Sequence, residues 1–239
     1  MTLEKFIQEL EMQRTEWRST TAHLVVFALC SFCFSILAWA VVAGKALPAD
    51  WLVMTALRSP EGLSEPRGPP WVKDWLLNFS ALGSASVLIF LVLAAAGFLV
   101  ARREGRSAGR LLAVAGGGQI MSSLLKAGFA RARPPEILHE AHVRGWSFPS
   151  GHSMMAAIVY LALAAMLSRS QERWTLKAYL LAAAGFAILS VGFSRVYLGV
   201  HWPTDVLGGW VAGLAWLSLF RCLPFPERET LLEDKCSNN

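Results

Sequence analysis

Long apolar runs constrain the fold of this chain more than any other feature. Six runs, most of them long enough to cross the hydrocarbon core of a bilayer, alternate with short polar segments. Each is predicted to be a helix, because backbone in lipid must satisfy its hydrogen bonds within its own segment. The predicted spans lie near residues 22–44, 77–101, 108–126, 151–168, 177–194 and 204–221. The chain is therefore predicted to be an all-α, polytopic integral membrane protein with six transmembrane helices in a bundle.

The composition agrees with a chain that is mostly embedded in lipid. Of the 239 residues, 54% are hydrophobic and 16% are charged, whereas soluble domains carry about 25% charged residues. The net charge of +5 does not indicate nucleic-acid binding, because no soluble basic segment with interleaved aromatic residues is present. We therefore expect this chain to be embedded in the lipid bilayer and to bind no nucleic acid.

Basic residues between the predicted spans indicate the orientation. Residues 102–110 and 169–177 are rich in Lys and Arg, and such residues are in excess in cytoplasmic loops. With six spans, both termini are then cytoplasmic too. The predicted outward loops are 45–76, 127–150 and 195–203. The compact architecture is typical of bacteria, which predicts an inner-membrane protein with these loops facing the periplasm or exterior.

The chain is predicted to hold one membrane domain, 22–221, between two cytoplasmic segments. Residues 1–21 place apolar side chains at helical spacing among charged ones, which indicates an amphipathic helix on the membrane surface. A solvated extension is the alternative. Residues 222–239 are predicted to be a loose polar tail.

Charged residues concentrate where the outward loops meet the last four spans. The three stretches that carry them are 126–134, 149–152 and 194–205. All three lie on the same predicted side of the membrane, so their side chains can converge. Charged groups at membrane depth are costly and by default indicate function. A site is therefore predicted at the extracytoplasmic ends of spans 3 to 6.

The residues of these stretches suit a phosphate-like anion. Lys126, Arg133 and Arg195 supply cationic donors. Ser150 occupies a helix N-cap position, and Gly151 leaves the backbone N–H groups open, so the start of span 4 is an anion site by itself. Arg131 and Arg144 are interpreted as ordinary loop charges outside the site, and Trp202 and Thr204 as filler positions of the third stretch.

Two histidines add the chemistry of phosphoryl transfer. Of His152 and His201, one can attack phosphorus while the other protonates the departing oxygen and then activates water. Asp205 lies four residues after His201, with Pro203 suited to the first helical turn between them. Its carboxylate is placed to hold the imidazole N–H. The alternative is an acidic residue that merely favours a helix N-terminus.

No metal site or cofactor is expected. Cys30 and Cys33 form a C-x-x-C pattern inside an apolar run, which predicts small buried side chains rather than a redox or zinc site. His139 and His142 lie close to acidic residues, but no third strong ligand has a convincing spacing.

The three stretches carry a family resemblance. They read K-x6-RP, PSGH and SR-x5-H-x3-D, which resembles the signature motifs of the type 2 phosphatidic acid phosphatase superfamily, in order and over residues 76–221. The resemblance implies metal-independent catalysis in which His201 forms a phosphohistidine, Asp205 orients it and His152 acts as general acid, then base. The residues implied to cradle the phosphate are Lys126, Arg133, Ser150, Gly151 and Arg195.

The expected function is hydrolysis of a membrane lipid phosphate or diphosphate, with phosphate as product. The substrates compatible with the resemblance are undecaprenyl diphosphate, phosphatidylglycerol phosphate, phosphatidate and lipid A. Two alternatives remain. A vanadium haloperoxidase has a similar anion site, but six spans argue against it. A non-catalytic protein that binds or transports lipid headgroups needs only the cations, so the pair His152 and His201 argues against it.

Overall fold

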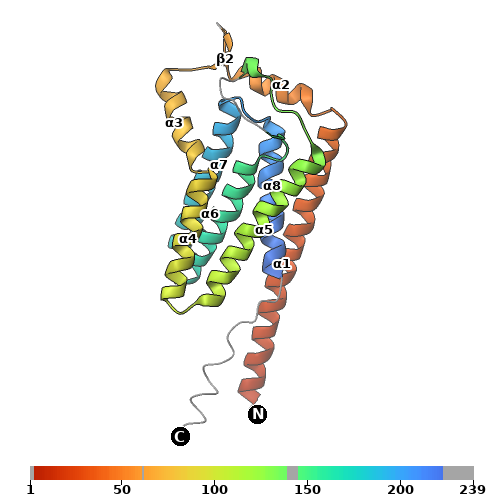
Figure 1. The fold of residues 1–239 in the computed structure, drawn as a ribbon. Coiled ribbons are helices and arrows are strands. Elements are labelled where there is room, and N and C mark those ends of the chain that lie inside the picture. Colours follow the sequence, from red (N-terminus) through yellow and green to blue (C-terminus); the bar gives the residue numbers. More distant parts are fainter. Residues whose placement is uncertain (1–2, 61, 139–144, 223–239) are drawn as a thin grey trace.

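The computed structural model describes residues 3–60, 62–138 and 145–222. Within these ranges the chain is mostly helical (Figure 1). The elements are α1 (Leu3–Val42), α2 (Leu47–Ala56), β1 (Arg58–Ser59), β2 (Gly62–Pro66), α3 (Pro70–Ala81), α4 (Ala85–Ala101), α5 (Gly105–Phe129), the 3-10 helix η1 (Glu136–Leu138), α6 (Gly151–Arg169), α7 (Trp174–Tyr197) and α8 (Pro203–Cys222).

The last four predicted spans correspond to α5, α6, α7 and α8, whose ends lie within about three residues of the predicted ones. Local signals set two of the boundaries. The Ser150 side chain accepts a hydrogen bond from the backbone N–H of Ser153 and caps α6. α8 begins at Pro203, whose missing N–H costs nothing in the first turn.

The second predicted span is two helices rather than one. α3 and α4 are bent by 44° where they meet. Ser84 caps α4 by accepting a hydrogen bond from the N–H of Val87. α3 also begins at Pro70, inside the stretch expected to be an outward loop.

The fold is mostly helical, as the sequence predicted, although the predicted outward loop 45–76 is not simply a loop. This segment holds α2 and a small antiparallel hairpin of β1 and β2. A buried arginine anchors the hairpin: Arg58 donates to the carbonyl oxygens of Tyr197 (2.8 Å) and Val196 (3.2 Å) at the end of α7. The partners lie in another helix, so the sequence of the loop alone does not reveal them.

α1 runs without a break from Leu3 to Val42. Residues 3–21 are therefore continuous with the first apolar run and do not form a separate helix. Contact of this segment with a membrane surface stays a prediction, as do the domain boundaries. The predicted polar tail lies outside the described residues beyond Cys222.

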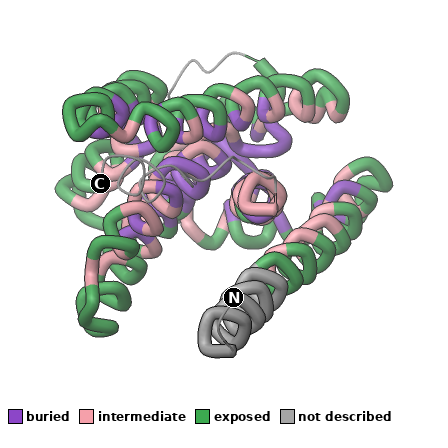
Figure 2. The backbone as a smooth tube through the Cα atoms, turned by 90° about the horizontal axis from the view of Figure 1, so that it is seen from below, coloured by how far each residue is buried: buried purple, intermediate pink, exposed green. Residues whose placement is uncertain are grey.

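Within the described residues, three helices are long and apolar enough to cross a membrane: Thr20–Val42 of α1, α6 and α7. The bent pair α3 and α4 is a fourth when it is counted as one span. α5 and α8 run alongside these helices in the same bundle (Figure 1). Exposed residues lie on the outer surface of the bundle, whereas buried residues collect toward its interior (Figure 2).

α6 lies at the centre of the bundle and contacts α4, α5, α7 and α8. Glycines allow the closest approach. A Cβ at Gly209 of α8 would lie 2.7 Å from the carbonyl oxygen of Ser150, and one at Gly213 would lie 2.9 Å from that of Met154. These short distances explain why glycine occupies both positions of the last span.

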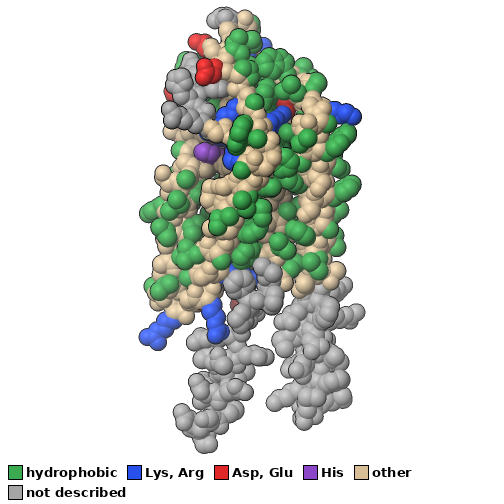
Figure 3. All heavy atoms as spheres, turned by 45° about the vertical axis from the view of Figure 1, so that its right-hand side comes forward, with side chains coloured by type: hydrophobic (Ala, Val, Ile, Leu, Met, Phe, Trp, Pro, Cys, Tyr) green, Lys and Arg blue, Asp and Glu red, His purple; other side chains and the backbone are tan. Residues whose placement is uncertain are grey.

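Charged side chains lie toward the two ends of the bundle. On the face drawn in Figure 3, a band of hydrophobic side chains separates Lys and Arg at one end from Lys, Arg, acidic residues and a histidine at the other. α2, the hairpin and the connection between α7 and α8 share the second end (Figure 1). The predicted site residues lie at this end.

Candidate active site

His201 lies in the short connection between α7 and α8. Gly199 adopts a φ of +81° there, a backbone conformation that favours glycine. The backbone N–H groups of Val200 and His201 both donate to the carbonyl oxygen of Arg195 (3.2 and 3.3 Å). This tight turn holds His201 with only 1% of its surface exposed.

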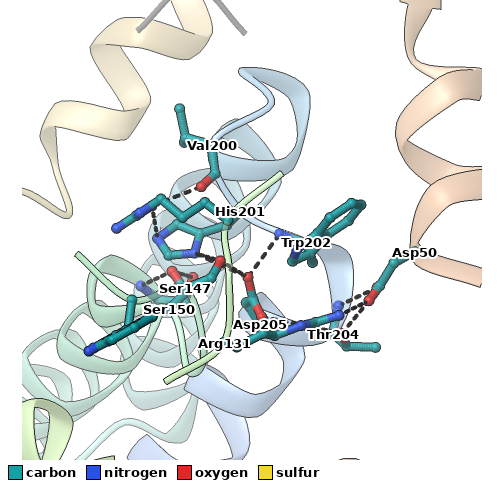
Figure 4. A network of polar contacts seen from close by, with 12 residues as sticks. Asp50, Arg131, Ser147, Ser150, Val200, His201, Trp202, Thr204 and Asp205 are labelled. Carbon is teal, nitrogen blue, oxygen red and sulfur yellow. Dashed lines mark hydrogen bonds and ion pairs between the residues drawn. The ribbon is translucent and has the colours of Figure 1, made fainter. Parts of the chain in front are cut away.

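The neighbours of His201 select one tautomer of its ring (Figure 4). Nδ1 lies 3.3 Å from Asp205 Oδ2, the contact that the four-residue spacing predicts. Nε2 lies 3.2 Å from Nη1 of Arg133, a group that only donates. Nε2 must therefore accept, and Nδ1 carries the proton and donates it to the carboxylate. The lone pair of Nε2 points toward the cationic side of the site.

Burial lowers the pKa of His201 to about 3, although its hydrogen bond and charge interaction with Asp205 act in the opposite direction. The imidazole is therefore neutral at physiological pH. A neutral imidazole whose Nε2 carries a lone pair is the form required of a nucleophile. Burial also lowers the pKa of Arg133, again partly offset by Asp205, but an arginine remains charged.

Asp205 is fully buried and accepts hydrogen bonds on both oxygens. Oδ2 accepts from the hydroxyl of Ser147 and from the backbone N–H of Trp202 (3.0 Å), besides facing His201. Oδ1 accepts from Nη1 of Arg131 at 2.6 Å. A carboxylate held at four points cannot rotate, so it fixes the plane of the imidazole.

The three predicted cations surround this ring from different elements. Arg133, in the loop after α5, also donates to the carbonyl oxygens of Gly145 (2.9 Å) and Val200 (2.8 Å). Arg195, in the last turn of α7, donates from Nη1 to the hydroxyl of Ser80 at 2.7 Å. The buried Nε of Arg195 has no hydrogen-bond partner among the described residues. An unpaired buried donor indicates a missing acceptor.

Lys126 and Gly151 meet at the start of α6. Nζ of Lys126 donates to the carbonyl oxygen of Trp146 at 2.9 Å. A Cβ at position 151 would lie 3.3 Å from Cε of Lys126. Glycine at this position therefore leaves room for the lysine side chain to pass the N-terminus of the helix. The predicted anion site at this N-terminus thus has a cation beside it.

His152 follows in the first turn of α6. Its imidazole lies close enough to interact electrostatically with Arg195, Lys126 and Arg133. His152 is therefore beside the same cation cluster as His201. On its other side is the break between α3 and α4, where a Cβ at Gly83 would lie 3.3 Å from Cβ of His152. The structure therefore brings all eight predicted site residues to one end of the bundle.

Comparison with known proteins agrees with this geometry. The family model of the PAP2 superfamily matches residues 107–229, about half of the chain, and the match includes all three motifs. The chain belongs to the PAP2 superfamily. The family resemblance inferred from the motifs is thus confirmed.

Several PAP2 relatives are lipid phosphatases. Phosphatidylglycerophosphatase B of Bacillus subtilis is 36% identical over 146 residues, which are 61% of this chain and 71% of that protein. The undecaprenyl-diphosphatase of Sulfolobus acidocaldarius is 32% identical over 104 residues, 41% of this chain and 46% of the relative. The lipid A 1-phosphatase of Rhizobium johnstonii is 33% identical over 116 residues, 44% and 43% of the two chains.

A solved structure shares the fold of this PAP2 protein. It is the crystal structure of a transmembrane PAP2-type phosphatidylglycerolphosphate phosphatase from Bacillus subtilis, 32% identical in sequence. The TM-score is 0.72, and the match covers 82% of this chain and 94% of that one. The likeness thus extends well beyond the three motifs.

Sequence reasoning missed five residues that contact the site. Two corrections concern the motifs themselves: Arg131 is not an ordinary loop charge, and Thr204 is not a filler, because both bind buried carboxylates. Arg131 lies two positions before Arg133 within the first motif stretch, and this position could have indicated that it contacts the site. Arg144 lies outside the described residues. The other missed residues, which carry no motif signal, are Asp50, Ser80 and Ser147.

Proposed function

We propose that this PAP2 protein is a metal-independent phosphatase that hydrolyses the phosphate or diphosphate group of a membrane lipid. The membership in the superfamily and the names of its relatives support the reaction class. The observation that carries the proposal is the orientation of His201, whose Nε2 faces Arg133 while Nδ1 is held by Asp205.

The proposed reaction has two steps. First, His201 Nε2 attacks phosphorus, a P–N bond forms, the P–O bond to the lipid breaks, and His152 gives its proton to the departing oxygen. Second, His152 takes a proton from water, which attacks the phosphohistidine. The P–N bond breaks and inorganic phosphate leaves. Together, the two steps need only these two imidazoles and one water molecule.

The cations supply binding and charge stabilisation. Arg133 and Arg195 have guanidinium groups suited to the equatorial phosphate oxygens, and the unpaired Nε of Arg195 is a donor left for the substrate. When phosphate engages Arg133, its donor to His201 Nε2 is drawn away and the lone pair is released. Lys126 and the N-terminus of α6 complete the cradle with Ser150 and Gly151.

A lipid substrate is supported by the position of the site at one end of an apolar bundle. We further propose that α1, the pair α3 and α4, and α5 to α8 make six crossings, with both termini cytoplasmic and the site facing the periplasm. Phosphatidylglycerol phosphate is the first candidate substrate, because the relative from Bacillus subtilis that is 36% identical over 146 residues acts on it by name. Undecaprenyl diphosphate, lipid A and phosphatidate are the further candidates.

The test is phosphate release from these four lipids by the purified protein in detergent, with EDTA present. His201→Gln is compared with His23→Gln, a matched control because His23 lies in α1 away from the site. We expect release from at least one lipid, abolished by His201→Gln and kept by His23→Gln. Release should persist with EDTA, and denatured samples should contain acid-labile phosphohistidine.

Three outcomes would contradict the proposal. Equal release by His201→Gln would remove the nucleophile assignment. No release from any lipid, with tight binding of inorganic phosphate, would indicate a headgroup-binding protein. Halide oxidation upon addition of vanadate would favour the haloperoxidase alternative, whereas vanadate inhibition without oxidation agrees with phosphatase chemistry.

A further inference from the structure

Asp50 is a buried carboxylate in a part of the chain where sequence indicated no function. It lies in the first turn of α2, outside the segment 107–229 that the family model matches. Only 1% of its surface is exposed. An acidic residue in a first turn is usually a solvated one that favours the helix dipole. Burial excludes that interpretation here, because a buried charge must be paired.

The partners of Asp50 lead directly to the site (Figure 4). Its Oδ2 accepts from Nη2 of Arg131 at 2.6 Å and from the hydroxyl of Thr204 at 2.6 Å. Its Oδ1 accepts from the backbone N–H of Thr204 at 2.9 Å. Nη1 of the same Arg131 donates to Asp205 Oδ1 at 2.6 Å. One guanidinium thus joins Asp50 to the carboxylate that holds His201.

Apolar packing reinforces this connection. Met54, one turn after Asp50, is fully buried against Trp202 and Val206. The rings of Trp51 and Trp202 lie 6.1 Å apart, and the guanidinium of Arg131 lies 5.6 Å from the Trp202 ring centroid. α2 is therefore held against the residue that follows His201, and a shift of this helix would move both carboxylates.

The charges suggest why two carboxylates are present. Arg131 alone would neutralise Asp205 through the ion pair at Oδ1 and weaken its hold on Nδ1–H of His201. Asp50 shares the guanidinium, so the three groups together keep one net negative charge beside the ring. When Nε2 bonds to phosphorus with Nδ1 still protonated, the imidazole ring becomes cationic. The net negative charge then stabilises the intermediate as it forms.

We propose that Asp50 is a positioning residue for the reaction, acting through Arg131 to hold Asp205 and the His201 ring and to balance their charge. This inference rests on the proposed phosphohistidine mechanism. It predicts a defect in the chemical step and not in binding, because Asp50 bonds to Arg131 and Thr204, whereas Lys126, Arg133 and Arg195 form the proposed substrate cradle.

The test uses the full-length protein in detergent with dioctanoyl phosphatidylglycerol phosphate as the probe. The variants are Asp50→Asn, Arg131→Gln and the double variant. Asp74→Asn is the matched control, since Asp74 is an exposed aspartate of α3. We expect Asp50→Asn to lower kcat about 10- to 100-fold, the usual cost of losing a group that orients a catalytic residue. KM and competitive inhibition by inorganic phosphate should change less than about twofold.

A coupled pair gives a distinct result in the double variant. If Asp50 acts through Arg131, the double variant should be no slower than Arg131→Gln alone, because the effects are not additive. A folded Asp50→Asn protein with unchanged kcat, or effects that multiply, would overturn the inference. If Asp50→Asn fails to fold, Arg131→Gln with full activity would overturn it as well. Failure of the mechanism itself is distinguishable: His201→Gln would keep activity, or the unmodified protein would release phosphate from none of the four candidate lipids.

Discussion

At the scale of single residues, the surroundings of His201 decide both its tautomer and its charge. Burial raises the free energy of the imidazolium, while Arg133 at Nε2 and Asp205 at Nδ1 leave one arrangement of the ring proton. The spacing of His201 and Asp205 predicted their contact. It did not predict Ser147, whose hydroxyl adds a further donor to the same carboxylate oxygen.

The first prediction concerns the pH dependence of stability. The pKa of His201 is about 3 in the folded protein and about 6.5 in an unfolded chain. Between these values the unfolded chain binds a proton that the folded one does not, so stability falls as pH falls from 6.5 toward 3. His201→Asn removes this proton, and we expect its Tm in detergent to fall less between pH 7 and pH 5. Equal falls in both proteins would contradict the assignment.

A direct measurement can test the same point. With 13C-labelled histidine, the ring signal that disappears in His201→Asn should not shift between pH 5 and pH 8, whereas exposed histidines titrate near pH 6.5. A midpoint near 6.5 for His201 would show that burial is not maintained in solution.

At the scale of elements, the break between α3 and α4 matters because it passes beside His152. A Cβ at Gly83 would overlap Cγ1 of Val191 in α7 and lie 3.3 Å from Cβ of His152. The apolar pattern of residues 77–101 indicated one continuous span, because the distribution of apolar residues along the sequence does not reveal a bend between two helices. Close approach between helices, not local preference, therefore accounts for glycine at this position.

The second prediction follows from this contact. Gly83→Ala should cost about 1–3 kcal/mol, the range for overpacking, and lower Tm in detergent. It should also lower activity, because relief of the overlap displaces His152. Gly97→Ala is the matched control: Gly97 lies in α4 with nothing within 4 Å of an added Cβ. We expect it to keep Tm and activity. Equal effects of the two substitutions would contradict the packing argument.

At the scale of the whole molecule, the charge distribution bears on orientation. The loop between α4 and α5 holds Arg102 and Arg103, and Arg106 lies in the first turn of α5, whereas α2, the hairpin and the site share the other end of the bundle. Basic loops remain on the cytoplasmic side. The proposed orientation therefore follows from loop charge and places the site outside.

The third prediction tests this orientation. After the native cysteines are replaced by alanine, Glu65→Cys in β2 and Ser107→Cys in α5 provide two exposed positions at opposite ends. A membrane-impermeant maleimide should label Cys at position 65 in spheroplasts of the expressing bacterium, and position 107 only after lysis. The reverse pattern would place the site in the cytoplasm.

Features that depend on neighbours along the chain could be predicted from the sequence. Apolar runs predicted the helices of the bundle, and Ser150 and Pro203 indicated two helix starts. The four-residue spacing of His201 and Asp205 predicted the contact between their side chains. The helices and their starts depend on helix periodicity and capping, whereas the contact of His201 with Asp205 depends on their closeness along the chain, since His201 precedes α8. The motifs added the cation cluster, because helix ends on one side of a membrane lie close together.

Contacts between distant segments could not be predicted in this way, because they depend on the tertiary packing. Asp50 binds Thr204 across 154 positions, and nothing in the local sequence distinguishes it from a solvated acid at a helix start. Arg131 differs from an ordinary loop charge only because α2 and α8 each bring a carboxylate to it. Burial and pairing of charge depend on which elements pack together, and no spacing rule encodes that packing.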